Sequence, residues 1–132
     1  MAKFAVQANK AAKALSTTTT DYTNASLIYY RQGLNDEEVA KRTEVTLKLA
    51  NVSRQSAQEV SDQLTAIWNN FDDGTKSLEY YADVITKLGA TTASSSEEIA
   101  SGLEKFSSIA RTVGLSYEYA TSMLATIVAR TR

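Results

Sequence analysis

Adjacent acidic residues are the side chains in this sequence best suited to acid–base or metal chemistry. Neighbouring side chains on a helix point about 100° apart, so the two carboxylates of a pair do not converge on one substrate or ion. Acids in the first turn of a helix instead complement its positive end. We therefore interpret the glutamate pairs as helix-start residues and assign no catalytic role to any of the three pairs, which are Glu37 and Glu38, Asp72 and Asp73, and Glu97 and Glu98.

The acidic stretch from Asn69 to Gly74 invites comparison with a calcium-binding loop. An EF-hand loop needs oxygen ligands at its positions 1, 3, 5 and 12. Counting from Asn69 places Phe71 at the third position and Tyr80 at the twelfth, so the pattern fails. The stretch predicts the end of a helix followed by a turn.

The composition excludes most catalytic and metal-binding arrangements. The chain has no cysteine and no histidine, which excludes disulfides, zinc–thiolate sites and the usual general base. Serines and threonines are abundant, but a hydroxyl nucleophile needs an adjacent base, and no lysine is paired with one in a recognisable pattern. We expect no catalytic residue, no metal, no cofactor and no small-molecule substrate.

Charge and aromatic spacing argue against a nucleic-acid site. The 14 basic and 15 acidic residues leave a net charge of -1, which attracts no polyanion. Single-strand binders interleave aromatic and basic residues, whereas the tyrosines here lie beside Glu79, Asp83 and Glu118. We interpret these tyrosines as residues of the seams between packed helices.

The spacing of the apolar residues predicts an all-α fold. The chain has no proline and five glycines, and its apolar residues recur every three or four positions. We expect six to seven helices, without a sheet, that form antiparallel helical hairpins in a small bundle. The expected helices cover residues 2–15, 22–32 and 36–50, and then run from Ser56 to Phe71, from Leu78 to Leu88, from Ser95 to near Gly114, and from Ser116 to the chain end.

Caps and stops mark these helices. A serine or asparagine oxygen can accept a bond from the backbone N–H three residues later, and a glutamate at that later position completes a capping box. Glycine just after a helix adopts the left-handed conformation that ends it. The expected caps are Thr20 or Asp21, Asn35 with Glu38, Ser56 with Glu59, Ser95 with Glu98, and Ser116; the expected stops are Gly33, Gly89 and Gly114.

An internal repeat of 60 residues relates two predicted helix pairs. Val39 and Leu64 correspond to Ile99 and Leu124, and similar pairs recur along both segments. The segment 72–93 supplies an intervening helix. We therefore divide the chain into residues 1–34, with an alanine-rich helix and a short helix, and residues 35–132, a helical-hairpin bundle that contains the repeat.

Two groups of apolar residues are candidates for contact with a partner. The first expected helix has only a thin apolar stripe, which needs a neighbouring helix to bury it. Aromatic residues at the helix seams form the second group. The candidate interaction residues are Phe4, Ala8, Leu15, Trp68, Tyr80 and Tyr117.

No segment of the sequence reads as a membrane span or a signal peptide. Lys10 and Lys13 interrupt the alanine-rich start before it reaches the length of a signal peptide, and no other run is long and apolar enough to cross a bilayer.

Four long strings resemble the core region of phage tail tape measure proteins, from the long non-contractile tails of phages and prophages of Gram-positive bacteria. The strings cover most of the chain and are WNNFDDGTKSLEYYADVITKLGATTASSSEEIASGLEKF, VGLSYEYATSMLATI, STTTTDYTNASLIYYRQGL and ANVSRQSAQEVSDQLTAIW. Tape measure proteins are much longer than this chain, so the resemblance implies a fragment.

The resemblance implies a structural role without catalysis. Copies of a tape measure protein lie inside the growing tail tube, tube subunits polymerise around them, and the length of the protein sets that of the tail. The implied partners are other copies of itself and tail tube and assembly proteins. The implied location is the virion, inside the tail tube, and the host cytoplasm during assembly. The alternative is a helical protein–protein interaction module without enzymatic activity.

Overall fold

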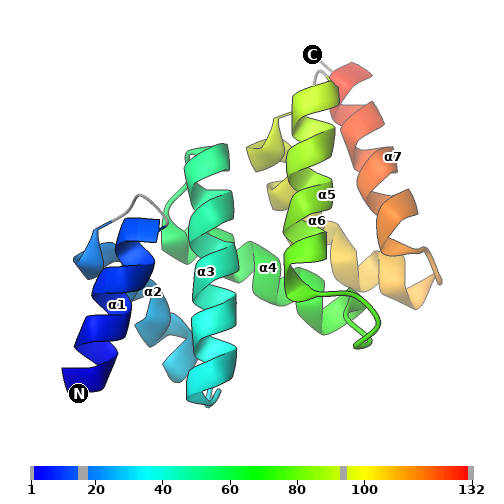
Figure 1. Cartoon of the computed structure of the whole chain (residues 1–132). Coiled ribbons are helices and arrows are strands. Elements are labelled where there is room, and N and C mark those ends of the chain that lie inside the picture. The colour runs from blue at the N-terminus through cyan, green and yellow to red at the C-terminus, as the bar shows by residue number, and fades with distance from the viewer. Residues whose placement is uncertain (1, 15–17, 93–94, 131–132) are drawn as a thin grey trace.

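The computed structural model describes residues 2–14, 18–92 and 95–130, without the side chains of residues 2–4 and 14. Within these ranges the chain forms seven α-helices and no strand, which confirms the predicted all-α bundle. Figure 1 shows α1 and α2 at one end of the molecule and α7 at the other. The helices are α1 (Ala2–Ala14), α2 (Thr19–Tyr30), α3 (Asp36–Ser53), α4 (Ala57–Phe71), α5 (Leu78–Thr91), α6 (Ser96–Thr112) and α7 (Tyr117–Arg130).

The predicted caps from Asn35 onward form, whereas the capping box predicted at Ser56 is incomplete, with the Glu59 carboxylate bonded to the Ser56 hydroxyl. Asn35 and Ser56 accept bonds from the N–H groups of Glu38 and Glu59. At Ser95 the capping box is complete, because the Glu98 carboxylate also accepts from the Ser95 backbone. Ser116, the last of the predicted caps, accepts from the N–H of Tyr119. Each such cap stabilises its helix by about 1 kcal/mol.

The start of α2 differs from the prediction. Thr18 is the N-cap residue, and its side chain accepts a bond from the N–H of Asp21. The prediction of Thr20 or Asp21 is therefore wrong, because Asp21 already lies in the first turn of the helix. Similarly, α3 continues past the predicted Ala50 to Ser53, where Arg54 adopts the left-handed conformation with φ 57°.

Gly89 does not end its helix, in contrast to the prediction. Gly33 and Gly114 have positive φ values of 81° and 80° after α2 and α6, as expected of helix stops. Gly89 instead lies inside α5, which continues to Thr91. A Cβ atom at Gly89 would lie 2.7 Å from the backbone nitrogen of Ser96, so the missing side chain allows α5 to approach the start of α6.

The main core lies between α3, α4, α5 and α6. Leu64 and Ile67 of α4 are buried together with Ile99 and Leu103 of α6, and α4 packs more extensively on α6 than on its chain neighbour α3. Tyr29 of α2 also belongs to this core. Burial of such side chains supplies roughly 1.5–3 kcal/mol each.

A smaller second cluster holds the amino-terminal helices together. Ala8 and Ala12 of α1 pack against Tyr22 and Ala25 of α2 and against Leu47 of α3. The thin stripe of α1 therefore has a neighbour within the chain. The division into residues 1–34 and 35–132 stays a prediction.

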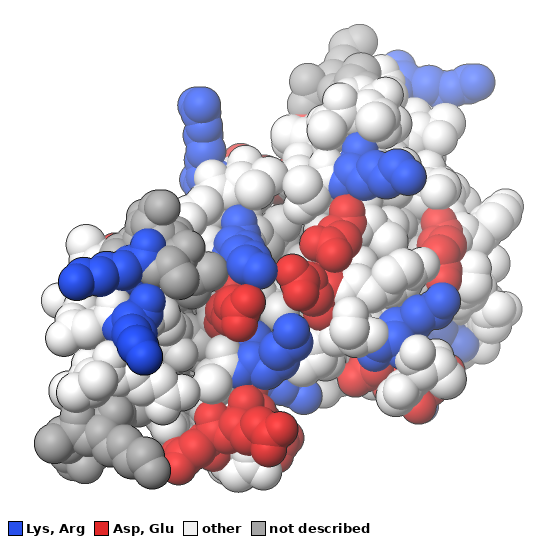
Figure 2. Space-filling model, in the orientation of Figure 1, with Lys and Arg blue, Asp and Glu red and all other residues white. Residues whose placement is uncertain are grey.

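The surface carries interspersed charges of both signs. On the face drawn in Figure 2, lysines and arginines alternate with aspartates and glutamates. None of the helices described is long and apolar enough to cross a membrane.

Candidate interaction site

Four aromatic rings form a cluster between the end of α4, the start of α5 and the start of α7. The ring of Tyr117 lies 4.9 Å from that of Tyr81 and 5.3 Å from that of Phe71, both in edge-on geometry. Tyr80 completes the cluster, 5.5 Å from Tyr81 and 6.5 Å from Tyr117. Such edge-on pairs add about 0.5–1.5 kcal/mol to the burial of their surface. The structure thus brings together Tyr80 and Tyr117, two of the predicted interaction residues.

Two hydroxyl groups of this cluster bind backbone carbonyls of neighbouring helices. Tyr117 donates to the carbonyl of Tyr81 at 2.6 Å, and Tyr81 donates to the carbonyl of Phe71 at 3.2 Å. The start of α7 is therefore tied to α5, and α5 to the end of α4. This arrangement agrees with the interpretation of the tyrosines as seam residues.

Burial keeps these hydroxyl groups neutral. It raises the pKa of Tyr81 to about 12, and it raises the pKa of Tyr117 well above the ordinary tyrosine value. A neutral tyrosine retains the proton that it donates. The cluster therefore holds the helices together and provides no acid or base that would titrate near neutral pH.

Trp68 lies in a separate part of the core. Its indole N–H donates to the carbonyl of Leu78 at 3.2 Å, and its ring lies 6.3 Å from that of Tyr29. The guanidinium of Arg42 stands over the indole, 4.8 Å from the ring centre. Trp68 thus joins α2, α3, α4 and the start of α5.

The candidates in the first helix are only partly described. Ala8 is buried against α2. Phe4 lies on α1, but its side chain is outside the described residues, as is Leu15 altogether. Because Ala8, Trp68 and Tyr117 are buried within the chain, they present almost no surface in this conformation. Contact of the six candidates with a partner stays a prediction.

A groove of about 340 Å³ opens beside the aromatic cluster. Its wall includes Tyr80, Tyr117, Asn70 and Arg111, and the ammonium of Lys76 stands 4.9 Å from the centre of the Tyr80 ring. The sequence reasoning assigned no role to Asn70, Lys76 or Arg111. Asn70 and Lys76 are six positions apart, but Arg111 is distant in the chain, and the packing of α6 on α4 brings it to this groove.

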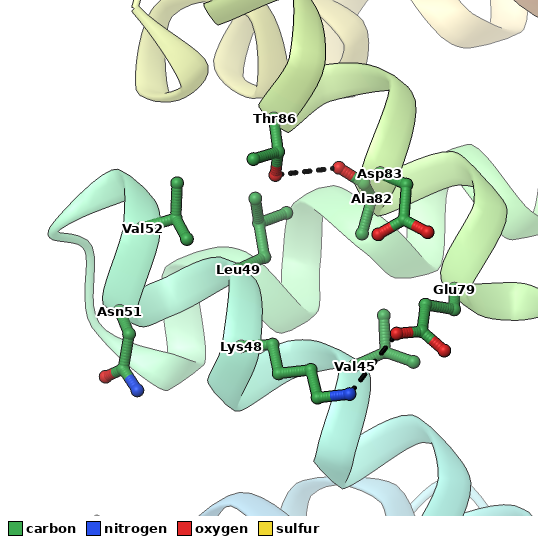
Figure 3. Close-up of a pocket in the computed structure, with 9 residues that line it drawn as sticks. All are labelled: Val45, Lys48, Leu49, Asn51, Val52, Glu79, Ala82, Asp83 and Thr86. Atoms are coloured by element: carbon green, nitrogen blue, oxygen red, sulfur yellow. Dashed lines mark hydrogen bonds and ion pairs between the residues drawn. The ribbon is translucent and has the colours of Figure 1, made fainter. Parts of the chain in front are cut away.

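A second groove, of about 330 Å³, lies between α3 and α5 (Figure 3). Lys48 of α3 binds Glu79 of α5 at 3.2 Å and Glu44 at 3.1 Å, and Lys41 approaches Glu79 at 3.7 Å. The hydrogen bond from Lys48 is the main cause that holds the pKa of Glu79 below its ordinary value. Sequence reasoning noted Glu79 only as a neighbour of tyrosines and missed this ion-pair network across two helices.

The acidic pairs of the sequence serve local structure. Asp72 and Asp73 accept bonds from the N–H groups of Gly74 and Thr75, which confirms the predicted turn after α4. Glu98 belongs to the capping box of α6. No three acidic side chains in the described ranges are close enough together to hold a metal ion.

The model of the family described as phage-related minor tail protein matches residues 8–132. The chain belongs to this family. Neither the curated proteins nor the solved structures contain a match.

Membership in the minor tail family identifies a phage tail protein, in agreement with the broader part of the sequence resemblance. In this tail protein the aromatic cluster and the ion pairs of α3 and α5 lie between helices. These contacts hold the helices in place relative to one another.

Proposed function

We propose that this chain is a structural segment of a phage tail tape measure protein, which acts in tail assembly and in the determination of tail length inside the tail tube. The main support for the proposal is the match to the minor tail family over residues 8–132. The long strings that resemble tape measure proteins support the tape measure type within this family.

The polar groups of several tyrosine, tryptophan, lysine and glutamate side chains bond within the chain, which supports a structural and non-enzymatic role. Tyr117, Tyr81 and Trp68 donate their hydrogen bonds to backbone carbonyls of the chain itself. Lys48 and Glu79 are engaged with each other across two helices. These groups stabilise helix packing, and we assign no catalytic step to them.

The proposed partners follow from this role. They are other copies of the tape measure protein and the tail tube and tail assembly proteins. The proposed location is the inside of the tail tube in the virion, reached from the host cytoplasm during assembly.

Deletion of residues 36–95 in the phage gene tests the proposal. The deletion removes one 60-residue period and leaves Asn35 directly before Ser96, so that a capping side chain still precedes α6. Sixty helical residues span about 90 Å. We expect electron microscopy to show tails shortened by up to this length. The duplication of residues 36–95 is the matched control and should lengthen the tails correspondingly.

Two other results would contradict the proposal. Tails of unchanged length in both variants would exclude a role of this segment in length determination. Normal tails in the deletion strain, together with loss of binding to one particular protein, would favour the alternative of a helical interaction module.

A further inference from the structure

Helix α5 has a counterpart in α2. Helices α2–α4 and α5–α7 of the described chain therefore form two similar three-helix units. α2 begins at Thr19 after the cap Thr18, and α5 begins at Leu78 after the cap Ser77, 59 positions later. α6 begins 60 positions after α3, and α7 begins 60 positions after α4. Helices α2, α3 and α4 all contact one another, and so do α5, α6 and α7. We call these groups the first unit and the second unit.

The second unit covers one face of the first unit. α3 packs on α5, and α4 packs on α6. Leu49 of α3 and Ile67 of α4 are consequently 1% and 0% exposed. This contact is an example, within the chain itself, of how two such units associate.

The equivalent face of the second unit is uncovered. Ile109 occupies the position of Leu49 and is 57% exposed, and Ile127 occupies the position of Ile67 and is 49% exposed. Val113 directly follows α6 and donates its backbone N–H to the carbonyl of Ile109; its side chain is 63% exposed. Met123 of α7 is half-buried. We call Ile109, Val113, Met123 and Ile127 the terminal face.

Two positions of the terminal face are more apolar than their counterparts on the covered face. Val113 replaces Ser53, and Met123 replaces Gln63, although both polar residues of the first unit are buried. The last unit of a helical stack normally has a polar outer face that keeps it soluble. The terminal face has the opposite character, which is typical of a surface that another element covers.

We propose that the terminal face docks a further three-helix unit with the chemistry of α5–α7. Such a unit would place helices like α5 and α6 on α6 and α7, as the second unit does on the first. This inference concerns a surface of the fold and does not depend on the tape measure role.

The ion pairs between the two units have no counterpart on the terminal face. Glu79 of α5 is bound by Lys41 and Lys48. Their counterparts in the second unit are Ser101 and Ser108. The choice of occupant therefore rests on the equivalence of the terminal face to the covered face of the first unit. A second copy of the chain could use only its first unit in this way, because its second unit already covers its own first unit. The face of α2 that would be needed is not free, since α1 packs on it through Ala8 and Ala12.

An extended chain tests the proposal. A second copy of residues 73–132 is added after Arg132, so that this unit follows α7 at the spacing with which residues 73–132 follow α4. The substitution Ile127→Asp, at the original position only, is made in the original and in the extended chain. Leu27→Asp on α2, where Leu27 is 44% exposed, is the matched control in both chains.

Thermal unfolding should distinguish the variants. We expect Ile127→Asp to lower the Tm of the extended chain by about 10 °C, because docking buries the charge. The Tm of the original chain should fall by about 2 °C or less, as for a surface substitution. Leu27→Asp should lower the Tm of the original chain and that of the extended chain by the same small amount.

Two results would overturn the proposal. If Ile127→Asp lowers the Tm of both chains equally, the added unit does not cover the terminal face. If the original chain sediments as a dimer that Ile127→Asp dissociates, a second copy is the occupant of this face.

Discussion

The hydroxyl of Tyr117 donates a hydrogen bond to the backbone carbonyl of Tyr81 across a distance of 2.6 Å. The two residues are 36 positions apart, and the bond connects the first turn of α7 to the first turn of α5. Tyr119, two positions further along α7, is 60% exposed. The same side-chain type thus has two different roles on one helix.

Substitution of Tyr117 by phenylalanine should measure the contribution of this bond. We expect Tyr117→Phe to lower the free energy of unfolding by about 1 kcal/mol, since a buried hydrogen bond is lost while the ring remains. The change is measured by urea denaturation followed by circular dichroism. Tyr119→Phe is the control and should change stability by less than about 0.5 kcal/mol. Equal effects of the two substitutions would show that the bond to Tyr81 contributes nothing.

Two glycines inside helices should respond in opposite directions to substitution by alanine. A Cβ atom at Gly89 would meet the backbone of Ser96 at 2.7 Å, whereas one at Gly102 would lie 3.4 Å from the flexible end of Leu124. We expect Gly89→Ala to destabilise the protein by roughly 1–3 kcal/mol through overpacking. Gly102→Ala should stabilise it by about 0.5–1 kcal/mol through helix propensity. Denaturation midpoints measure both, and stabilisation by Gly89→Ala would contradict the close approach of α5 and α6.

The complete capping box at the start of α6 should contribute measurably to stability. Ser95→Ala removes the acceptor of the Glu98 N–H, and we expect it to cost about 1–2 kcal/mol. Ser122→Ala, at an exposed position inside α7, is the matched control and should be neutral or slightly stabilising because alanine favours helix. Thermal unfolding of the two variants makes the comparison. A Ser95→Ala protein as stable as the parent chain would mean that the start of α6 is held by packing alone.

The ion pairs of Glu79 should make a small, pH-dependent contribution to stability. Because Lys48 lowers the pKa of Glu79 in the folded chain, the stabilisation is present above the ordinary glutamate pKa of 4.5. It is lost as the pH falls through the lower folded value. Since the side chain is about one-third exposed, we expect Glu79→Gln to cost only about 0.5 kcal/mol at pH 7.

Denaturation of the Glu79→Gln protein at pH 7 and near pH 3 tests this dependence. The difference from the parent chain should shrink at the lower pH and at high salt. Glu104→Gln, on the exposed side of α6, is the control for the loss of one negative charge. A difference that is as large near pH 3 as at pH 7 would show that Glu79 acts through something other than its charge.

The helix types, their order and most of their boundaries follow from the sequence by itself. Asn35, Ser56, Ser95 and Ser116 mark helix starts because a cap bonds to a backbone group only three residues away. Such local interactions can be predicted without knowledge of the fold. The Thr18 cap was missed because a run of threonines offers several equivalent acceptors.

Only the tertiary structure decided which helices are neighbours and what individual residues contact. The main packing partner of α4 is α6 rather than the adjacent α3, and Gly89 is required by the approach of Ser96 rather than by a helix end. The same holds for the bond of Tyr117 to Tyr81 and for the exposure of Ile127. An apolar stripe specifies that a helix face is to be buried, but non-directional hydrophobic contact does not specify the partner that buries it.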